Sequence, residues 1–290
     1  MTKALVVGMG IGQLYQKVFT ELKYEVETVD TSTKRKSTYK SLNDISTYDI
    51  AVICTPNSTH EEIARTIASK CKIVLVEKPG VIDSKCWQCL VEDFPNTRFM
   101  MVKNNQYRKE IAEFKRLADS SDRIQAVWTN KNRIPNPGSW FTTKEQAFGG
   151  VSRDLLPHLL SYYTILTDYK NGTKLFGHKV QRFDLTNTTE TDYGTVTPDG
   201  VYDVDDLAEL EYKNNECLWV LSANWRDNNK DDVFLGFSSK NSAVRHGLGL
   251  CPEDAYKKMI TTALSKIDDV SFWKDQYDQD IWIHEQIENL

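Results

Sequence analysis

The chain has 290 residues, of which 40% are hydrophobic and 27% are charged. This length exceeds that of most single domains, so we expect two domains, each with its own core. The formal net charge of −5 gives no basic footprint and argues against nucleic acid as a partner. Because no stretch approaches the roughly 20 apolar residues of a membrane helix and the N-terminus lacks a signal-peptide pattern, we expect a cytoplasmic protein with no membrane partner.

Short β-branched runs alternate with helical patterns in the first part of the chain. We expect strands at about 3–8, 25–30, 49–54, 73–77 and 98–102, and helices at about 12–23, 60–70, 83–92 and 109–119. This order predicts an α/β fold, with a doubly wound parallel sheet of the Rossmann type over residues 1–120. Right-handed crossovers would place helices on both faces of that sheet.

The pattern changes after about residue 120. We expect a strand at 123–134, a helix at about 150–167, strands at 177–187, 204–213, 216–225 and 232–237, and a closing helix at about 272–288. The two strands that Asn214-Asn215 joins are a good hairpin candidate. Residues 121–290 are therefore predicted to form an α+β domain with a mostly antiparallel open sheet.

The cysteines are scattered and do not suggest a disulfide framework in a chain of this length. Cys86 and Cys89 form a single CxxC motif without the second pair that would complete a zinc site. Free cysteines usually behave as small buried hydrophobes, so we favour packing over redox or metal chemistry for this pair. No metal is expected.

A glycine-rich turn follows the first predicted strand and precedes a helix. The sequence GMGIGQ places Gly8, Gly10, Ile11 and Gly12 where backbone can approach a pyrophosphate at a helix N-terminus. The third glycine comes one residue earlier than in the GxGxxG pattern. Either the turn is shorter, or Gln13 stands where close packing usually needs glycine. The alternative interpretation is a purely structural turn.

Asp30 closes the second predicted strand, where a carboxylate can accept a hydrogen bond from a ribose 2′-hydroxyl. That position favours NAD as the cofactor. Lys34, Arg35 and Lys36 follow and could neutralise a 2′-phosphate, or they could form a solvated basic loop. NADP therefore stays open.

Polar residues at the ends of the next two strands are further cofactor-binding candidates. They are Thr55, Pro56, Asn57 and His60 after the third strand, and Glu77 and Lys78 after the fourth. Ligands of open α/β sheets bind outside the carboxyl ends of the strands. The ammonium of Lys78 could be a surface charge or the working cation of an active site.

Asp154 and His158 are four residues apart in the predicted helix at 150–167, so they would share one face. A histidine titrates near neutral pH and suits proton transfer during alcohol oxidation, and an aspartate can orient its ring. Alone, such a pair is more often structural. With Lys78 and the glycine turn in the same chain, we interpret it as catalytic. The candidates for the substrate cleft are Asn105, Tyr107, Arg108, Arg133, Trp140 and Phe141. The two aromatic residues could equally belong to a core, and the arginines could form ion pairs.

These motifs together resemble the glucose–fructose oxidoreductase, inositol dehydrogenase and rhizopine-catabolism (Gfo/Idh/MocA) family of NAD(P)-dependent oxidoreductases. The resemblance rests on VGMG from Val7, TPNSTH from Thr55, EKP from Glu77, NQYR from Asn105, and Gly149-Gly150 followed by Asp154 and His158. Three features depart from the family pattern: Leu156 stands where members usually have glycine, the glycine turn is shortened, and the chain is short.

The resemblance implies hydride transfer between a nicotinamide and a secondary hydroxyl or ketone of a sugar, nucleotide sugar or cyclitol. Lys78 would bind the hydroxyl, His158 would act as the acid/base, Asp154 would support it, and the peptide before Pro79 would be cis. A homo-oligomer, dimer or tetramer, through the C-terminal sheet is also implied. Two rival functions are a non-catalytic dinucleotide-binding sensor of the same fold and a reductase of a non-sugar substrate.

Overall fold

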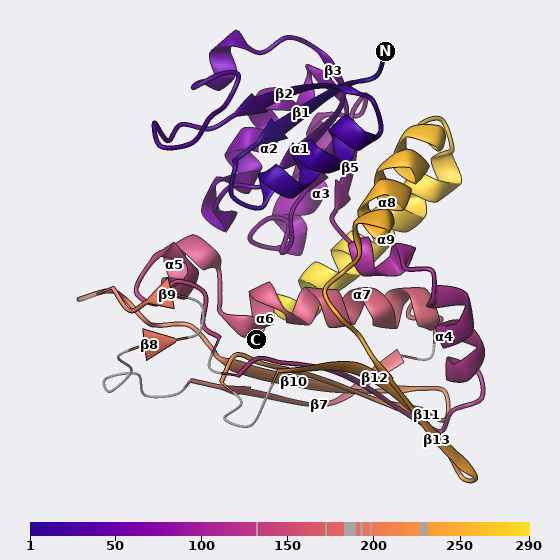
Figure 1. The fold of residues 1–290 in the computed structure, drawn as a ribbon. Helices are drawn as coiled ribbons and strands as arrows, with labels where there is room; N and C mark the ends of the chain where they lie inside the picture. Colours follow the sequence, from indigo (N-terminus) through magenta and orange to yellow (C-terminus); the bar gives the residue numbers. More distant parts are fainter. Residues whose placement is uncertain (132, 172, 183–189, 192–193, 198, 227–230) are drawn as a thin grey trace. The chain divides into compact units, whose positions relative to one another are not determined.

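The computed structural model describes all residues except 132, 172, 183–189, 192–193, 198 and 227–230. The chain forms two compact units (Figure 1): Met1–Tyr107 together with Glu253–Asn289, and Arg108–Pro252. This division differs from the predicted boundary at residue 120. It also places the C-terminal segment in the first unit, whereas we expected it in the second.

The first unit contains a five-stranded parallel sheet in the order β2-β1-β3-β4-β5. Its strands are β1 (Lys3–Val7), β2 (Glu25–Val29), β3 (Tyr48–Ile53), β4 (Cys71–Val76) and β5 (Arg98–Met101). Nearly every residue of the central strands is buried, as in a sheet covered on both faces. The predicted doubly wound fold is confirmed. Its strand order reverses between β1 and β3, where such folds bind their ligands.

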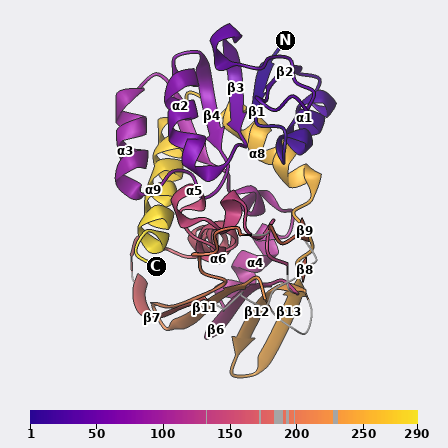
Figure 2. The ribbon, with the colours of Figure 1, turned by 90° about the vertical axis from the view of Figure 1, so that its left-hand side faces the viewer.

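Five helices accompany this sheet in the first unit (Figure 2). They are α1 (Gly12–Glu21), α2 (His60–Ala68), α3 (Ser84–Asp93), α8 (Glu253–Ser265) and α9 (Val270–Ile287), with short 3-10 turns η1 (Leu42–Asp44), η2 (Asn57–Thr59) and η3 (Asn104–Tyr107). Helix α8 was not predicted, although its buried residues recur at helical spacing: Ala255, Tyr256, Met259, Ile260 and Ala263. The predicted closing helix corresponds to α9.

The second unit contains a six-stranded sheet in the order β13-β12-β6-β11-β10-β7. Its strands are β6 (Arg123–Thr129), β7 (Thr173–Gln181), β10 (Leu207–Asn214), β11 (Cys217–Asn224), β12 (Asp232–Ser239) and β13 (Ser242–Gly247), and β8 (Glu190–Thr191) pairs separately with β9 (Gly194–Thr195). The pair β6–β11 is parallel and the other neighbours are antiparallel, so the predicted mostly antiparallel sheet is confirmed. The predicted hairpin is β10–β11, with Asn215 at a positive φ of 53°. Strand β13 was not predicted, and the end of the strand expected at 177–187 lies outside the described residues.

The helices of the second unit are α4 (Ile111–Ala118), α5 (Lys144–Ala147), α6 (Val151–Asp154) and α7 (Leu156–Leu166), with a 3-10 turn η4 (Trp140–Thr142). The prediction of one continuous helix over 150–167 is wrong, because the chain breaks at Leu155 between α6 and α7. Pro157 explains the break: it has no amide hydrogen to give to the carbonyl of Arg153 four residues earlier. Among the residues that the structure describes, every helix is too short or too polar to cross a bilayer.

Candidate functional site

Two glycines of the turn between β1 and α1 make close packing contacts. A Cβ on Gly8, whose φ is +89°, would lie 2.7 Å from the carbonyl oxygen of Cys54. A Cβ on Gly12 would lie 2.8 Å from Cγ1 of Val6, so this third glycine brings α1 close to β1. The shorter-turn alternative therefore holds, and Gln13 is not the packing residue; its amide donates to the carbonyl of Met9 at 3.0 Å.

Gly10 differs from its two neighbours because the space beside it is open. A Cβ there would meet the guanidinium of Arg35 at 3.7 Å as its nearest neighbour. Ile11 follows as the half-exposed N-cap residue of α1, whose first turn carries no acidic side chain. An open backbone at a helix N-terminus, beside a cation, fits the pyrophosphate of a dinucleotide.

The two glycines allow a matched test of this turn. Gly8→Ala is expected to destabilise the protein by at least about 1–2 kcal/mol, the usual cost of a left-handed residue with a Cβ. Gly10→Ala should leave stability unchanged but weaken NADH binding, because a methyl group would then occupy the open space. Thermal unfolding and a fluorescence titration with NADH measure the two effects. Unchanged NADH affinity in both variants would contradict a cofactor role for the turn.

Asp30 is buried at the end of β2 and is held by the turn itself. Its Oδ2 accepts from the amide of Met9 at 2.7 Å, and its Oδ1 accepts from the amide of Ser32 at 2.8 Å. The guanidinium of Arg35 lies 3.4 Å from Oδ2. Burial alone would raise the pKa of Asp30, but these hydrogen bonds and the guanidinium lower it, which keeps the carboxyl ionised. Asp30 thus presents an anion beside the turn, as NAD recognition requires.

The segment after β3 is fastened by His60 at the start of α2. The ring of His60 is fully buried, with Nδ1 2.7 Å from the carbonyl oxygen of Gly80 and Nε2 2.8 Å from that of Thr55. Burial lowers the pKa of His60, and the charge of Lys78 acts in the same direction. His60 therefore links the chain after β3 to the chain after β4. Pro56 and Asn57 lie between Thr55 and His60, at the start of η2.

Glu77 and Lys78 follow β4 at the carboxyl edge of the sheet. Glu77 is buried, and its Oε1 accepts a 2.5 Å hydrogen bond from the hydroxyl of Tyr15 on α1. Burial raises the pKa of Tyr15, and the charge of Glu77 adds to the effect. Within residues 73–81, all of them described, Lys78 is the one residue that is not buried. The Lys78–Pro79 peptide is cis, as the resemblance implied.

Asp154 and His158 of the second unit stand out in the same way. Within residues 149–164, all of them described, these two are the residues that are not buried. The indole Nε1 of Trp225 donates to Oδ2 of Asp154 at 3.0 Å, and the ring of His158 stacks on Trp128 with centroids 5.1 Å apart. Each polar group is thus held by a tryptophan, Trp225 just after β11 for Asp154 and Trp128 on β6 for His158. The break at Leu155 lies between them, so they belong to two successive short helices and not to the one continuous helix that we expected.

Asp205, to which the sequence alone assigned no role, fixes the start of α6. Its carboxylate accepts from the amides of Gly150 and Ser152 at 2.8 and 2.7 Å and from the hydroxyl of Ser152 at 2.8 Å. A Cβ on Gly150 would lie 1.7 Å from the carbonyl oxygen of Asp205. This contact explains the glycine, and it fixes the start of α6, the helix that carries Asp154. The signal was present in the sequence as an acidic run before β10.

The six substrate-cleft candidates fall in both units. In the first unit, Asn105 is buried and Tyr107 is half-buried within η3. In the second unit, Arg108 is buried and donates to the carbonyl of Gly249 at 2.6 Å, and the half-buried Arg133 follows β6. Trp140 and Phe141 stack on each other at 3.8 Å between centroids. Their substrate role stays a prediction.

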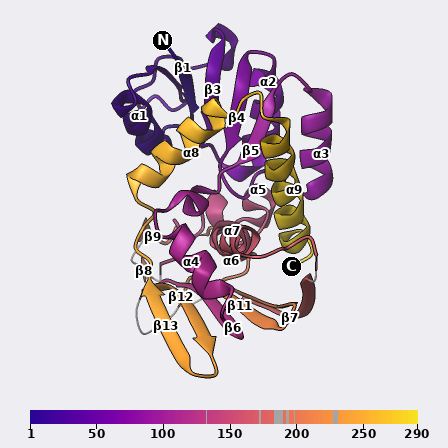
Figure 3. The ribbon, with the colours of Figure 1, turned by 90° about the vertical axis from the view of Figure 1, so that its right-hand side faces the viewer.

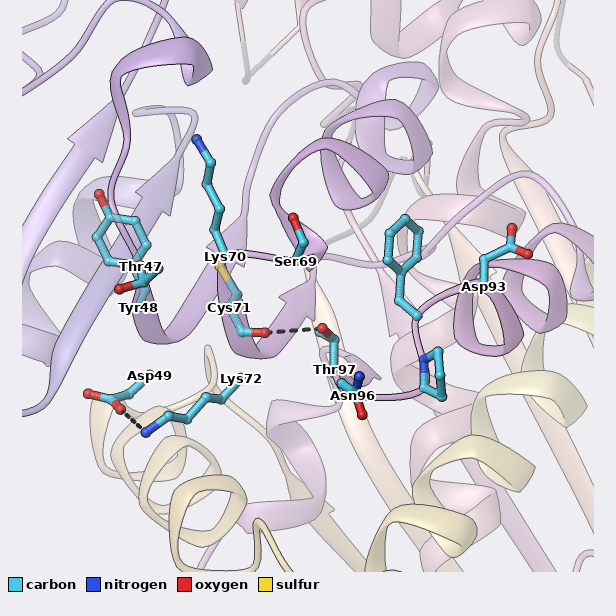
Figure 4. Close-up of a pocket in the computed structure, with 12 residues that line it drawn as sticks. Thr47, Tyr48, Asp49, Ser69, Lys70, Cys71, Lys72, Asp93, Asn96 and Thr97 are labelled. Atoms are coloured by element: carbon cyan, nitrogen blue, oxygen red, sulfur yellow. Dashed lines mark hydrogen bonds and ion pairs between the residues drawn. The ribbon is translucent and has the colours of Figure 1, made fainter.

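A hollow of about 570 Å³ lies at the opposite edge of the first unit's sheet, at the amino ends of β3 and β4 (Figure 4). Its lining includes the Asp49–Lys72 ion pair of 2.8 Å and Thr97, whose hydroxyl lies 3.1 Å from the carbonyl of Cys71. Ligands of this fold bind at the carboxyl edge. None of the predicted site residues lines the hollow, so we do not place the cofactor there.

Comparison with known proteins agrees with the fold of the first unit. Residues 3–100 match the model of an oxidoreductase family with an NAD-binding Rossmann fold, which is the Gfo/Idh/MocA family. The match lies within the first unit, which is therefore similar to the NAD-binding domain of this family. A curated protein of Amycolatopsis mediterranei, with the provisional name UDP-kanosamine synthase oxidoreductase subunit, is 29% identical over 133 residues. That match covers 44% of this chain and only 37% of the relative's length.

Several solved structures share the fold over the whole chain. The structure of GenD2 from gentamicin A biosynthesis, in complex with NAD, superposes with a TM-score of 0.78 at 17% identity, covering 99% of this chain and 92% of GenD2. Levoglucosan dehydrogenase with NADH and levoglucosan has a TM-score of 0.70 at 13% identity and covers 99% and 96%. The myo-inositol dehydrogenase of Corynebacterium glutamicum has a TM-score of 0.69 at 14% identity and covers 100% and 95%. At these identities the likeness concerns the fold alone.

Proposed function

We propose that the protein is an NAD-dependent oxidoreductase that transfers a hydride between the nicotinamide and a secondary hydroxyl or ketone of a sugar, nucleotide sugar or cyclitol. The observation that carries the proposal is a pattern of exposure. Residues 73–81 and 149–164 are all buried except Lys78, Asp154 and His158, which are partly exposed. A histidine can take the hydroxyl proton, a lysine can stabilise a developing alkoxide, and an aspartate can support the charged imidazole. The family's NAD-binding fold supports the cofactor, and the names of the relatives support polyhydroxylated substrates.

Residues at the carboxyl edge of the first sheet would hold the cofactor. The open backbone at Gly10 would receive the pyrophosphate, and the ionised Asp30 would accept a hydrogen bond from the adenosine ribose. Thr55, Asn57 and Glu77 are proposed to lie along the remainder of the dinucleotide. When bound, the nicotinamide supplies the hydride acceptor or donor.

The side chains would then move the proton and stabilise the charge. In the oxidative direction, an imidazole nitrogen of His158 would accept the proton of the substrate hydroxyl. At the same time, the carbon that bears this hydroxyl would give up its hydrogen as a hydride to the nicotinamide. The ammonium of Lys78 would stabilise the developing alkoxide, an interaction that gains strength where water is excluded. Asp154, held by Trp225, would favour the protonated imidazole.

A turnover assay tests the proposal. NAD⁺ and NADP⁺ are each offered with a panel of cyclitols, aldoses and nucleotide sugars, and absorbance at the reduced nicotinamide band is followed. We expect turnover with at least one polyhydroxylated substrate and a preference for NAD⁺. Binding of NADH without hydride transfer on any substrate would overturn the proposal and favour a dinucleotide-binding sensor. Turnover confined to apolar ketones or imines would favour a reductase of non-sugar substrates.

The contacts within the basic loop after Asp30 favour NAD over NADP. The guanidinium of Arg35 already contacts Asp30, while Lys40 donates to the carbonyls of Ser32 and Arg35 at 2.8 and 2.7 Å. These contacts tie the basic loop to itself and to the carboxylate, so the loop is less available for a 2′-phosphate. We therefore propose NAD first.

The homo-oligomer through the sheet of the second unit stays a prediction. The exposed apolar side chains of Leu175 and Phe176 on β7 support it.

A further inference from the structure

The loop that carries Lys78 is held from behind by the C-terminal helix α9. Gly80, two residues after Lys78, has a φ of +83°, and a Cβ on it would lie 2.6 Å from Nε2 of His284. The next amide, that of Val81, donates to the same nitrogen at 3.2 Å. The ring of His284 therefore lies directly against the backbone that follows the Lys78–Pro79 peptide.

His284 is fully buried, and its partners define its protonation. Its Nδ1 lies 2.6 Å from the carbonyl oxygen of Asp280, which can only accept a hydrogen bond. Its Nε2 faces the amide of Val81, which can only donate. The tautomer with hydrogen on Nδ1 satisfies both partners. The indole of Trp87 stacks on the ring, with centroids 5.4 Å apart, and fixes its plane.

The helix that carries His284, α9, runs beside α3 and β5 (Figure 3), and side-chain contacts anchor it at three points. Asp280, one turn earlier on the same face, forms a fully buried ion pair with Lys103 and accepts from the amide of Met101 at 3.0 Å. Near the helix end, Glu288 accepts from the amide of Ser84 at 2.7 Å. These contacts join α9 to the end of β5 and to the start of α3. Because α9 is anchored, the ring of His284 has a fixed place against the backbone at Gly80 and Val81.

The loop is also held on its other side. The carbonyl of Gly80 lies 2.7 Å from Nδ1 of His60, so two buried histidines flank one glycine. His60 is bonded to that carbonyl, and His284 to the amide that follows it. These two hydrogen bonds hold the backbone at Gly80 and Val81, just after Lys78, from both sides.

We infer that His284 is the positioning residue for Lys78: it fixes the loop from which the ammonium reaches the substrate hydroxyl. The inference rests on the proposed function, because it assigns His284 a purpose in the same reaction. This positioning role differs from a role in stability. Because α9 is anchored by other contacts, removal of the acceptor nitrogen of His284 should shift the loop that carries Lys78 and should not unfold the first unit. A misplacement of about 1 Å can cost about 10²-fold in rate.

Three variants of the full chain test this inference. His284→Leu removes the acceptor, His284→Gln restores one at the position of Nε2, and Glu285→Gln is the control on the exposed side of the same helix. We expect kcat to fall about tenfold to 10²-fold in His284→Leu, with the Kd of NADH unchanged, and to recover in His284→Gln. Hydrogen exchange of the peptide spanning Gly80 and Val81 should be at least about tenfold faster in His284→Leu alone.

The outcomes separate the inference from the proposed function. Wild-type exchange in His284→Leu overturns the inference, as does faster exchange with no loss of kcat. A wild type that transfers no hydride overturns the proposed function, while the exchange data still decide whether His284 holds the loop. If His284→Leu does not fold, His284→Asn, whose shorter amide cannot reach the Val81 nitrogen, takes its place.

Discussion

Replacing His158 with alanine is expected to lower kcat by about 10²–10⁴-fold, the usual contribution of a positioned proton-transfer group. The imidazole is the proposed acceptor of the hydroxyl proton, and alanine offers no group that could take its place. NADH affinity should not change, because the proposed cofactor residues lie in the other unit. Steady-state rates across pH, with the substrate that the panel identifies, and a parallel NADH titration measure both quantities.

The matched control is His178→Ala, which removes an exposed histidine from β7 of the same unit. It should leave kcat unchanged. Trp128→Leu adds a second comparison, because it keeps the histidine but removes the ring on which it stacks. We expect an intermediate loss of kcat there. Full turnover in His158→Ala would show that another group carries the proton.

The architecture of the first unit could be predicted because its signals are local. Buried β-branched runs such as that of β4 have a length and composition that only a parallel strand explains well. The position of the C-terminal segment could not be predicted in this way. Its place in the first unit depends on contacts such as Asp280 with Met101 and Glu288 with Ser84, between residues about 180–200 positions apart.

The catalytic candidates show the same division between local and distant information. The spacing of Asp154 and His158 singled them out, but the same four-residue spacing joins Asp280 to His284, which the sequence analysis passed over. The structure distinguishes the pairs by burial: the first is partly exposed, and the second is fully buried. Burial depends on partners from distant segments, Trp225 and Trp128 in one case and Lys103 in the other. A spacing pattern carries no information about those partners.

Removing the carboxylate of Asp280 is expected to have the largest effect on stability. Asp280→Ala leaves the ammonium of Lys103 fully buried without a counter-ion and leaves the amide of Met101 without its acceptor. Burial raises the pKa of Asp280 to about 6, while Lys103 counteracts that rise, so the two groups depend on each other. Breaking a buried ion pair on one side typically costs about 3–5 kcal/mol. Urea unfolding followed by circular dichroism gives the change in the free energy of unfolding.

Two further variants show whether the loss comes from the unpaired charge. Asp278→Ala breaks an exposed pair with Lys274 of 2.8 Å on the same helix, and it should cost less than about 1 kcal/mol. The double change Lys103→Met with Asp280→Leu removes both charges and should regain much of the stability lost by Asp280→Ala, because apolar residues of similar volume replace the pair. A double variant as unstable as Asp280→Ala would mean that the hydrogen bond to Met101, rather than the uncompensated ammonium, dominates. In that case α9 would be anchored chiefly through the backbone of β5.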